Sequence, residues 1–314
     1  MTSATGPTLG PTVGLRLPPA LFHDAKALRE FLRYVDATPL ERVCVGDHVT
    51  FREGIGFDGL QLATAAAVLT ERVAIETAVY LLPLRHPVPV ARQIGSLATL
   101  APGRFIFGVG VGGEDRSEML ACGVDPSTRG RRLDESLSIV RELLDGKAVS
   151  RAEGLFELDR VRVLPAPTTR VPFLVGGRSE AALRRAGRLG DGWLAVWVSP
   201  RRFAEGCAEV QRHADDVGRE VERWEHGMHV WCGFGPDRPA ARAELAAQME
   251  SLYGIGFERF ERYCPHGSPE EVADAIRPYL DVGCTSVNLI ATAPSAREAA
   301  DGAVRVRALL RGEA

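Results

Sequence analysis

The chain is poor in several features that would mark a particular class of protein. Among its 314 residues there are only two lysines, Lys26 and Lys147, and no apolar run approaches the roughly 18 residues of a membrane-spanning helix. The six cysteines are widely separated and form no C-x-x-C pair. These absences argue against a membrane protein and against a disulfide or zinc framework. They predict reduced thiols in a cytoplasmic protein without a metal site.

The chain also lacks a strong charge of either sign. Its formal net charge is −3, and apart from the run 129–132 the basic residues are scattered singly. This distribution argues against a nucleic-acid partner. The first residues lack the basic and apolar blocks of a signal peptide. We therefore expect a flexible tail over residues 1–11 and one folded domain over residues 12–314.

Strand-like and helix-like segments alternate along the whole chain, with no linker and no shift in composition. The expected strands cover residues 12–17, 41–46, 73–79, 104–107, 171–175, 193–198, 227–232 and 285–290. The expected helices include residues 24–37, 59–70, 89–100, 127–144, 180–189, 200–217, 239–253 and 295–310, with another beginning at Ser268. A short extended insert is expected at 154–158. Alternating strands and helices predict a parallel sheet.

Eight strand–helix units in a chain of this length favour a (β/α)8 TIM barrel of a single domain. The competing fold is a doubly wound sheet that binds NAD, because Gly108, Gly110 and Gly113 fit the pattern G-x-G-x-x-G. In that fold the glycines usually follow the first strand, whereas here they follow the fourth. The barrel is therefore the preferred fold, and NAD binding remains a distant alternative.

In a barrel of this kind the functional residues gather at the carboxyl ends of the strands. Glycine and polar residues occur at several of these ends. They are residues 47–48, 78–82, 110–114 and 176–179, with Trp197 after the sixth strand.

Several motifs resemble those of the bacterial-luciferase-like oxidoreductases. They are LTERV at 69–73, TAV at 77–79, LRHP at 84–87, ARQI at 91–94, GRFIFGVG at 103–110, RGRRLDE at 129–135, LVGGRS at 174–179, LGDGW at 189–193 and SPEEV at 268–272. Members of this family are (β/α)8 barrels, commonly homodimers. They use reduced FMN with oxygen, or the deazaflavin coenzyme F-420 for hydride transfer. The resemblance therefore implies an F-420- or FMN-dependent enzyme and a homodimer.

The resemblance implies catalytic roles for His48, Asp47 and Glu114. Asp47 and His48 match a pair that lies against the cofactor ring in deazaflavin-dependent members, where the histidine acts as acid or base. Glu114 stands one place beyond an active-site glutamate of the sugar-phosphate dehydrogenases, and Gly113 occupies the aligned place. The tryptophans usual in the family are also replaced, by Gly113 and by Arg52.

The resemblance likewise implies a cofactor-binding set. Ala78 and Val79 match a bulged strand end behind the ring, where members often carry a cis peptide. Asp47 joins this set, and Gly110 and Gly112 lie at the glycine-rich strand end. Residues 176–179 (Gly176, Gly177, Arg178 and Ser179) match the phosphate-binding turn, where a helix start favours an anion.

The function predicted from these residues is hydride transfer between F-420 and a small organic substrate. The first alternative is an FMNH2-dependent luciferase-like monooxygenase, and the second is a non-catalytic flavin-binding member. The Asp47–His48 pair favours the deazaflavin. The substrate itself is left open.

Overall fold

The structure is a computed structural model that describes residues 10–52, 54, 56–113 and 115–313. Its sheets contain β1 (Thr12–Arg16), β2 (Arg42–Val45), β3 (Ala74–Tyr80), β4 (Phe105–Val109), β5 (Val149–Arg151), β6 (Leu158–Val161), β7 (Phe173–Gly176), β8 (Gly192–Val196), β9 (Gly227–Phe234), β10 (His266–Gly267) and β11 (Ser286–Thr292). The α-helices are α1 (Ala25–Ala37), α2 (Gly59–Leu69), α3 (Pro87–Leu100), α4 (Arg116–Ala121), α5 (Arg129–Leu144), α6 (Glu180–Leu189), α7 (Pro200–Asp215), α8 (Arg238–Tyr253), α9 (Pro269–Leu280) and α10 (Ala296–Arg311).

The main sheet is a closed barrel of eight parallel strands. Its strand order is β10-β9-β11-β1-β2-β3-β4-β7-β8, and β9 also pairs with β8, so the sheet returns to itself. Each of the eight expected strands is present, and the short β10 is added beside β9. The predicted (β/α)8 barrel is confirmed.

Contacts divide the described residues of the chain into two compact units. Unit 1 takes its residues from Met1–Val43, Ala195–Cys207 and Glu225–Ala314, and unit 2 from Cys44–Leu194 and Ala208–Trp224. The candidate site lies in unit 2.

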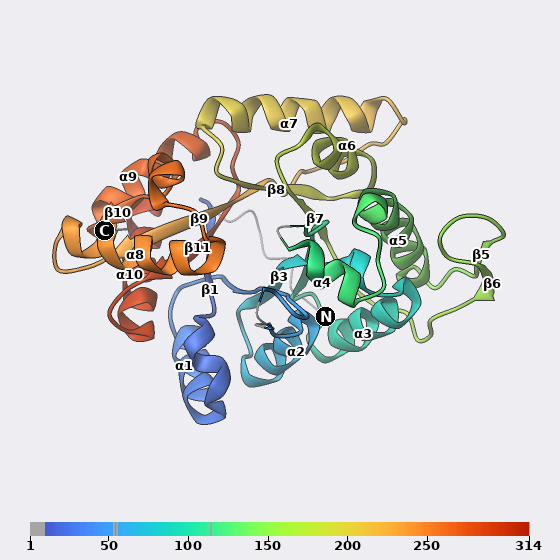
Figure 1. Cartoon of the computed structure of the whole chain (residues 1–314), viewed down its shortest axis with the longest axis horizontal. Helices are drawn as coiled ribbons and strands as arrows, with labels where there is room; N and C mark the ends of the chain where they lie inside the picture. The colour runs from blue at the N-terminus through green and yellow to red at the C-terminus, as the bar shows by residue number, and fades with distance from the viewer. Residues whose placement is uncertain (1–9, 53, 55, 114, 314) are drawn as a thin grey trace. The chain divides into compact units, whose positions relative to one another are not determined.

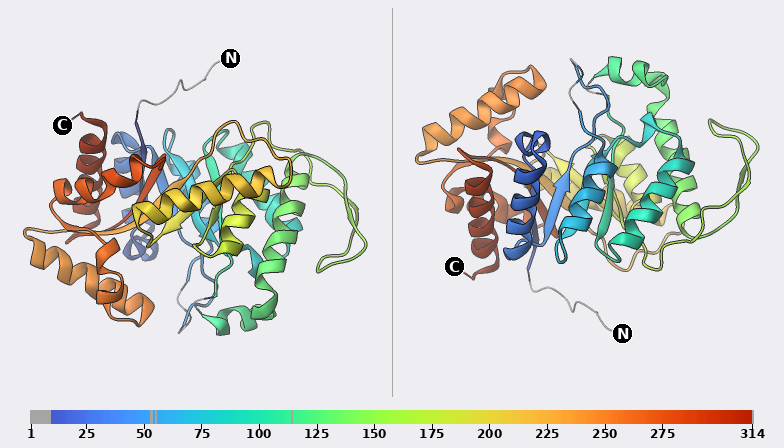
Figure 2. Two further views of the ribbon diagram at one scale, coloured as in Figure 1. Left: turned by 90° about the horizontal axis from the view of Figure 1, so that it is seen from above. Right: turned by 90° about the horizontal axis from the view of Figure 1, so that it is seen from below.

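Unit 2 is built on strands whose side chains are buried on both faces. All five residues of β4 are buried, and Phe107 packs edge-on against Phe173 of β7. Continuous apolar strands of this kind need helices outside them. Figure 1 shows α2, α3 and α5 following one another around these strands, and α3 packs against α5. The β5–β6 hairpin extends beyond α5 in both views of Figure 2.

In unit 1, β1 pairs with β11 and β11 with β9, all in parallel register. Helix α10 packs against α9 and against both β1 and β11. A Cβ at Gly302 of α10 would lie 2.5 Å from the Phe234 ring, so glycine is required where helix and strand approach this closely.

Two local expectations were wrong. Residues 154–158 were expected to be extended, but residues 152–157 form bends and an irregular link, and the strands β5 and β6 lie on either side of them. The helix expected from residue 127 begins at Arg129, because residues Pro126–Thr128 form a separate 3-10 turn. Helix α4 was not expected at all.

Among the described residues, no helix is both long and apolar enough to cross a membrane.

Candidate functional site

Asp47 follows β2 and holds three segments of unit 2 together. Its Oδ1 accepts hydrogen bonds from the Gly59 backbone N–H and an Arg85 Nη, each at 2.9 Å. Its Oδ2 accepts from the Leu81 N–H at 2.9 Å and from the other Arg85 Nη at 2.5 Å. The loop after β2 is thereby fastened to the start of α2 and to the segment after β3. This two-pronged arginine–carboxylate contact is a strong and directional form of ion pair.

Burial sets the electrostatics of this ion pair. Asp47 is 3% exposed, and burial raises the pKa of its carboxyl group above the ordinary range, although the Arg85 guanidinium and the backbone N–H groups oppose that rise. Burial is the largest single influence on Arg85 and acts against its charge, but attraction to Asp47, Tyr80 and Asp58 and the hydrogen bond to Asp47 together outweigh it, so the pKa of the guanidinium is raised. Arg85 lies over the ring of Tyr80, 4.6 Å from its centre. We infer that the two charges depend on each other.

His48, the next residue, is held by a carboxylate that the sequence analysis did not single out. Its Nδ1 lies 3.1 Å from Glu118 Oε2. The His48 side chain is 28% exposed, whereas the Glu118 side chain is only 2% exposed. The imidazole is therefore anchored on one side while part of its surface remains open to solvent.

Glu118 is well suited to stay ionised in this position. Burial alone would raise its pKa, but the hydrogen bonds from His48 and from the N–H groups of Val49 and Thr50 outweigh burial, and its pKa is lowered. Its Oε1 accepts the Val49 N–H at 2.7 Å and the Thr50 N–H at 3.2 Å. One carboxylate thus fixes both the His48 ring and the loop that follows it.

Helix α4 positions Glu118. Asp115 is its N-cap, accepting the Ser117 N–H at 2.8 Å, and it also accepts the Arg52 N–H. The cap therefore ties α4 to the loop that carries His48. No sequence signal except the Asp-x-Ser cap could have shown this helix in advance, because six residues are too few to display a helical period.

The predicted cofactor-binding residues of β3, β4 and β7 meet at Val79. The peptide bond between Ala78 and Val79 is cis, as the resemblance implied. A Cβ at Gly110 or at Gly176 would lie 2.6 Å from a methyl carbon of Val79. Glycine at both places therefore makes room for the Val79 side chain, which is partly exposed. Gly112 has a φ of +63° and lies beside Leu81.

The predicted phosphate-binding turn lies between β7 and α6. Gly177 has a φ of +124°, and its carbonyl accepts the indole N–H of Trp193. Ser179 is the N-cap of α6 and accepts the Ala182 N–H at 3.3 Å. Arg178 and Ser179 are exposed. The turn therefore offers a helix start, an exposed hydroxyl and an exposed guanidinium, which is a chemistry that suits a phosphate.

The structure brings most of the predicted set into one region of unit 2. Asp47 bonds to Leu81, Val79 lies beside Gly110 and Gly176, and Val79 also packs against the apolar cluster that contains Leu81 and Met119, the neighbour of Glu118. Glu114 lies outside the described residues. Arg85 and Glu118 were missed as site residues, because their partners stand 38 and 70 residues away in the sequence.

This region has groups of the kinds that a flat, phosphate-bearing cofactor contacts. Val79 is partly exposed and apolar, with Gly110 and Gly176 beside it, and the turn before α6 supplies groups for an anion. Within the described ranges, no three or more His, Cys, Asp or Glu side chains are grouped so that they could hold a metal ion.

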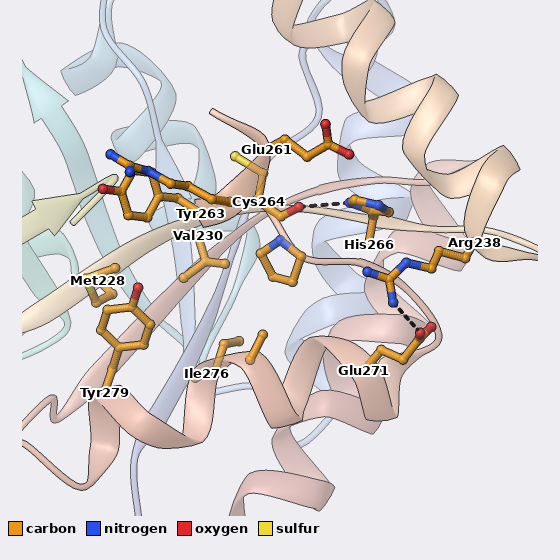
Figure 3. Close-up of a pocket in the computed structure, with 13 residues that line it drawn as sticks. Met228, Val230, Arg238, Glu261, Tyr263, Cys264, His266, Glu271, Ile276 and Tyr279 are labelled. Atoms are coloured by element: carbon orange, nitrogen blue, oxygen red, sulfur yellow. Dashed lines mark hydrogen bonds and ion pairs between the residues drawn. The ribbon is translucent and has the colours of Figure 1, made fainter. Parts of the chain in front are cut away.

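A separate hollow of about 360 Å³ lies in unit 1 between β9 and α9 (Figure 3). Met228, Val230 and Ile276 form apolar parts of its lining, and Arg238 and Glu271 form an ion pair at 2.9 Å. None of the predicted site residues lines it, and at least this arginine is already neutralised. It is therefore a weaker candidate than the region around His48.

Comparison with known proteins now gives the family. The profile described as "luciferase-like monooxygenase" matches residues 5–260. The chain belongs to this family. Among its relatives, an uncharacterized protein of Mycobacterium tuberculosis is 38% identical over 160 residues, which are 50% of this chain and 54% of that protein. The chain thus spans about half the length of this mycobacterial relative.

Two further known proteins match more of the chain. The F420-dependent glucose-6-phosphate dehydrogenase of Nakamurella multipartita is 27% identical over 271 residues, covering 77% of this chain and 80% of that protein. The solved structure of an F420-dependent secondary alcohol dehydrogenase superimposes with a TM-score of 0.82 at 20% identity, covering 95% and 98% of the two chains. Because the identity is only 20%, the likeness to this alcohol dehydrogenase shows the fold alone. The predicted family is confirmed.

Proposed function

We propose that this luciferase-like chain is an oxidoreductase that transfers a hydride between the deazaflavin coenzyme F-420 and a small organic substrate. The observation that carries the proposal is the partly exposed His48 ring, held at Nδ1 by the buried Glu118 carboxylate. Relatives that use F420, such as the Nakamurella dehydrogenase, support the choice of cofactor.

The residues around His48 have separate roles in this reaction. Because Glu118 accepts a hydrogen bond from Nδ1–H, the other ring nitrogen of His48 is the one that exchanges a proton with the substrate. Glu118 is a positioning residue. Asp47, whose oxygens are taken up by Arg85, Gly59 and Leu81, acts indirectly by fixing the loop.

The cofactor, when bound, supplies or accepts the hydride. Ala78, Val79, Gly110 and Gly112 would hold its ring system, and Gly176, Gly177, Arg178 and Ser179 would hold its phosphate. The roles of these residues and of Glu114 remain predictions, as do a cytoplasmic location and a homodimer.

The test is a fluorescence titration of the purified protein with F-420 and, separately, with FMN. We expect saturable binding of F-420 and oxidation or reduction of F-420 with some member of a panel of small alcohols and ketones. His48→Ala should lower kcat at least tenfold with little change in F-420 affinity. His23→Ala, at an exposed position of unit 1, is the control. Unchanged turnover of His48→Ala, or indifference to F-420, would overturn the proposal.

The second candidate is an FMNH2-dependent monooxygenase, favoured by the match of residues 5–260 to a family described as monooxygenases. Oxygen consumption with FMN and a flavin reductase, together with no turnover of F-420, would establish it instead. Binding of either cofactor without turnover under both conditions would indicate the non-catalytic alternative.

A further inference from the structure

A hollow of about 340 Å³ on unit 2 is rich in arginine. It lies between α5, α6 and β5, and it is lined by Asp134, Glu135, Ser138, Arg151, Arg184, Arg185, Arg188 and Leu189. Four guanidinium groups therefore face two carboxylates. Guanidinium groups stay charged at any ordinary pH, so the hollow carries an excess of positive charge.

Two of the four arginines are already neutralised by neighbours. The Arg185 side chain is 4% exposed, and its Nε donates to Asp134 Oδ1 at 2.6 Å. Its Nη2 donates to the Gly130 carbonyl at 3.1 Å, so a buried guanidinium is rigidly placed beside the hollow. Arg151 pairs with Glu142. These contacts give the hollow a fixed wall.

The other two arginines carry the unbalanced charge. Arg184 and Arg188 are exposed and one helical turn apart on α6. Neither forms an ion pair within the described part of the chain. Glu135, the remaining acid of the lining, is engaged by Arg131 at 3.6 Å and by the Leu155 N–H at 2.7 Å. Like charges at this spacing repel each other, so a bridging anion would relieve that repulsion.

We propose that this hollow binds a small multivalent anion carrying phosphate or carboxylate groups, held between Arg184 and Arg188. The planar guanidinium groups can each offer two N–H donors to such an anion. A volume of this size admits a small ligand. The hollow borders the side of α6, whereas the turn at 176–179 precedes that helix. It is therefore a second anion site, and it does not depend on the proposed function.

The experiment compares two matched double variants by isothermal titration at low salt. Arg184→Gln/Arg188→Gln removes the unbalanced pair. Arg29→Gln/Arg33→Gln removes a pair of exposed arginines at the same spacing on α1. Neither of these residues lines the hollow on unit 2 or the hollow between β9 and α9. The probes are inorganic pyrophosphate and tricarballylate. The wild-type chain and the α1 variant should bind at least one probe at the same stoichiometry, and the α6 variant should lose one site or bind it at least tenfold more weakly.

Crystals grown with tungstate then locate the site directly. An anomalous peak between Arg184 and Arg188 supports the proposal, and its disappearance in the α6 variant supports it further. Binding of pyrophosphate alone assigns phosphate ligands, and binding of tricarballylate alone assigns carboxylates. Three results would overturn the proposal. They are equal weakening of binding in both double variants, binding of neither probe, and an anomalous peak only at residues 176–179.

Discussion

At the scale of single residues, the site rests on two carboxylates with different duties. Asp47 has no exposed side-chain surface and is bonded by Arg85 and two backbone N–H groups, whereas Glu118 reaches a side chain that is partly open to solvent. Adjacent residues, Asp47 and His48, therefore face different partners. One supports the loop and the other presents a titratable ring.

Removing Asp47 should leave the largely buried Arg85 with only the partly exposed Asp58 carboxylate, at 3.1 Å, as an ion-pair partner. Asp47→Ala is expected to lower the free energy of unfolding by about 3–5 kcal/mol, as for other broken buried pairs. Urea denaturation measures the loss. Glu30→Ala, which breaks the exposed Lys26–Glu30 pair at 3.9 Å, should cost less than about 1 kcal/mol. Similar losses in the two variants would contradict the structural role of Asp47.

Replacing Glu118 by glutamine should separate positioning from folding. Glu118→Gln keeps the side-chain shape but loses the charge that holds His48, so kcat should fall about tenfold or more while KM changes little. The pKa of Glu118 is lowered in the folded chain, so this carboxylate keeps its charge, and its hold on His48, through the ordinary carboxyl range and loses them only as the pH passes that lowered value. The variant has no carboxylate to protonate, so its pH–rate profile should lack the limb that reports the loss of this charge. An unaltered pH–rate profile would remove Glu118 from the mechanism.

At the scale of elements, the short helix α4 decides whether Glu118 can reach His48. It has six residues, and Asp115 both caps it and binds the loop at Arg52. An isolated helix of this length has little stability of its own, so its cap and its packing through Met119 must hold it.

Loss of the cap should therefore loosen α4 without unfolding the chain. In Asp115→Ala we expect amide exchange in residues 116–121 to speed up several-fold and kcat to fall, while Asp115→Asn should preserve both. Asp125→Ala, which removes the cap of the 3-10 turn Pro126–Thr128, is the matched control. If exchange in α4 were equal in both alanine variants, the cap would not be what holds the helix.

The elements also differ in how far the sequence alone could predict them. The run Phe105–Phe107 is apolar throughout and reads as a buried strand, which is what β4 is. Ser268 with Glu271 signals a helix start, and the capping box of α9 is present. In contrast, α4 shows no period, and the expected extended insert at 154–158 proved to be the link of a hairpin, because Gly154 adopts a φ of +121°.

At the scale of the whole molecule, buried histidines link stability to pH. Burial lowers the pKa of His226 to about 4 and that of His229 to about 3, the latter helped by the positive charges of Arg16 and Arg42. Both side chains are almost inaccessible, at 5% and 8% exposed. Both must therefore be neutral in the folded chain at neutral pH.

The sign of the pH effect follows from these lowered values. Below the unfolded pKa of about 6.5 the unfolded chain takes up protons that the folded chain refuses. The contribution of the two neutral histidines to the free energy of unfolding is thus complete above about pH 6.5, and it is lost as the pH falls toward 4 for His226 and toward 3 for His229. His226 alone accounts for about 3 kcal/mol across this range. Urea unfolding between pH 7 and 4.5 gives the free energy of unfolding as a function of pH. This free energy should fall less steeply toward low pH in His226→Gln than in the wild type or in the exposed-site variant His23→Gln. Equal pH dependences would contradict the role of His226.

The sequence by itself determined the repeating strand–helix order, the family and the residues at the strand ends, because these depend on local periodicity and short motifs. Only the tertiary structure decided which residues contact one another in the site. Arg85 bonds to Asp47, Glu118 bonds to His48, and Val79 lies against Gly110 and Gly176. Such pairings join residues far apart in the chain. They arise when parallel strands bring their carboxyl ends to one edge, which no local pattern encodes.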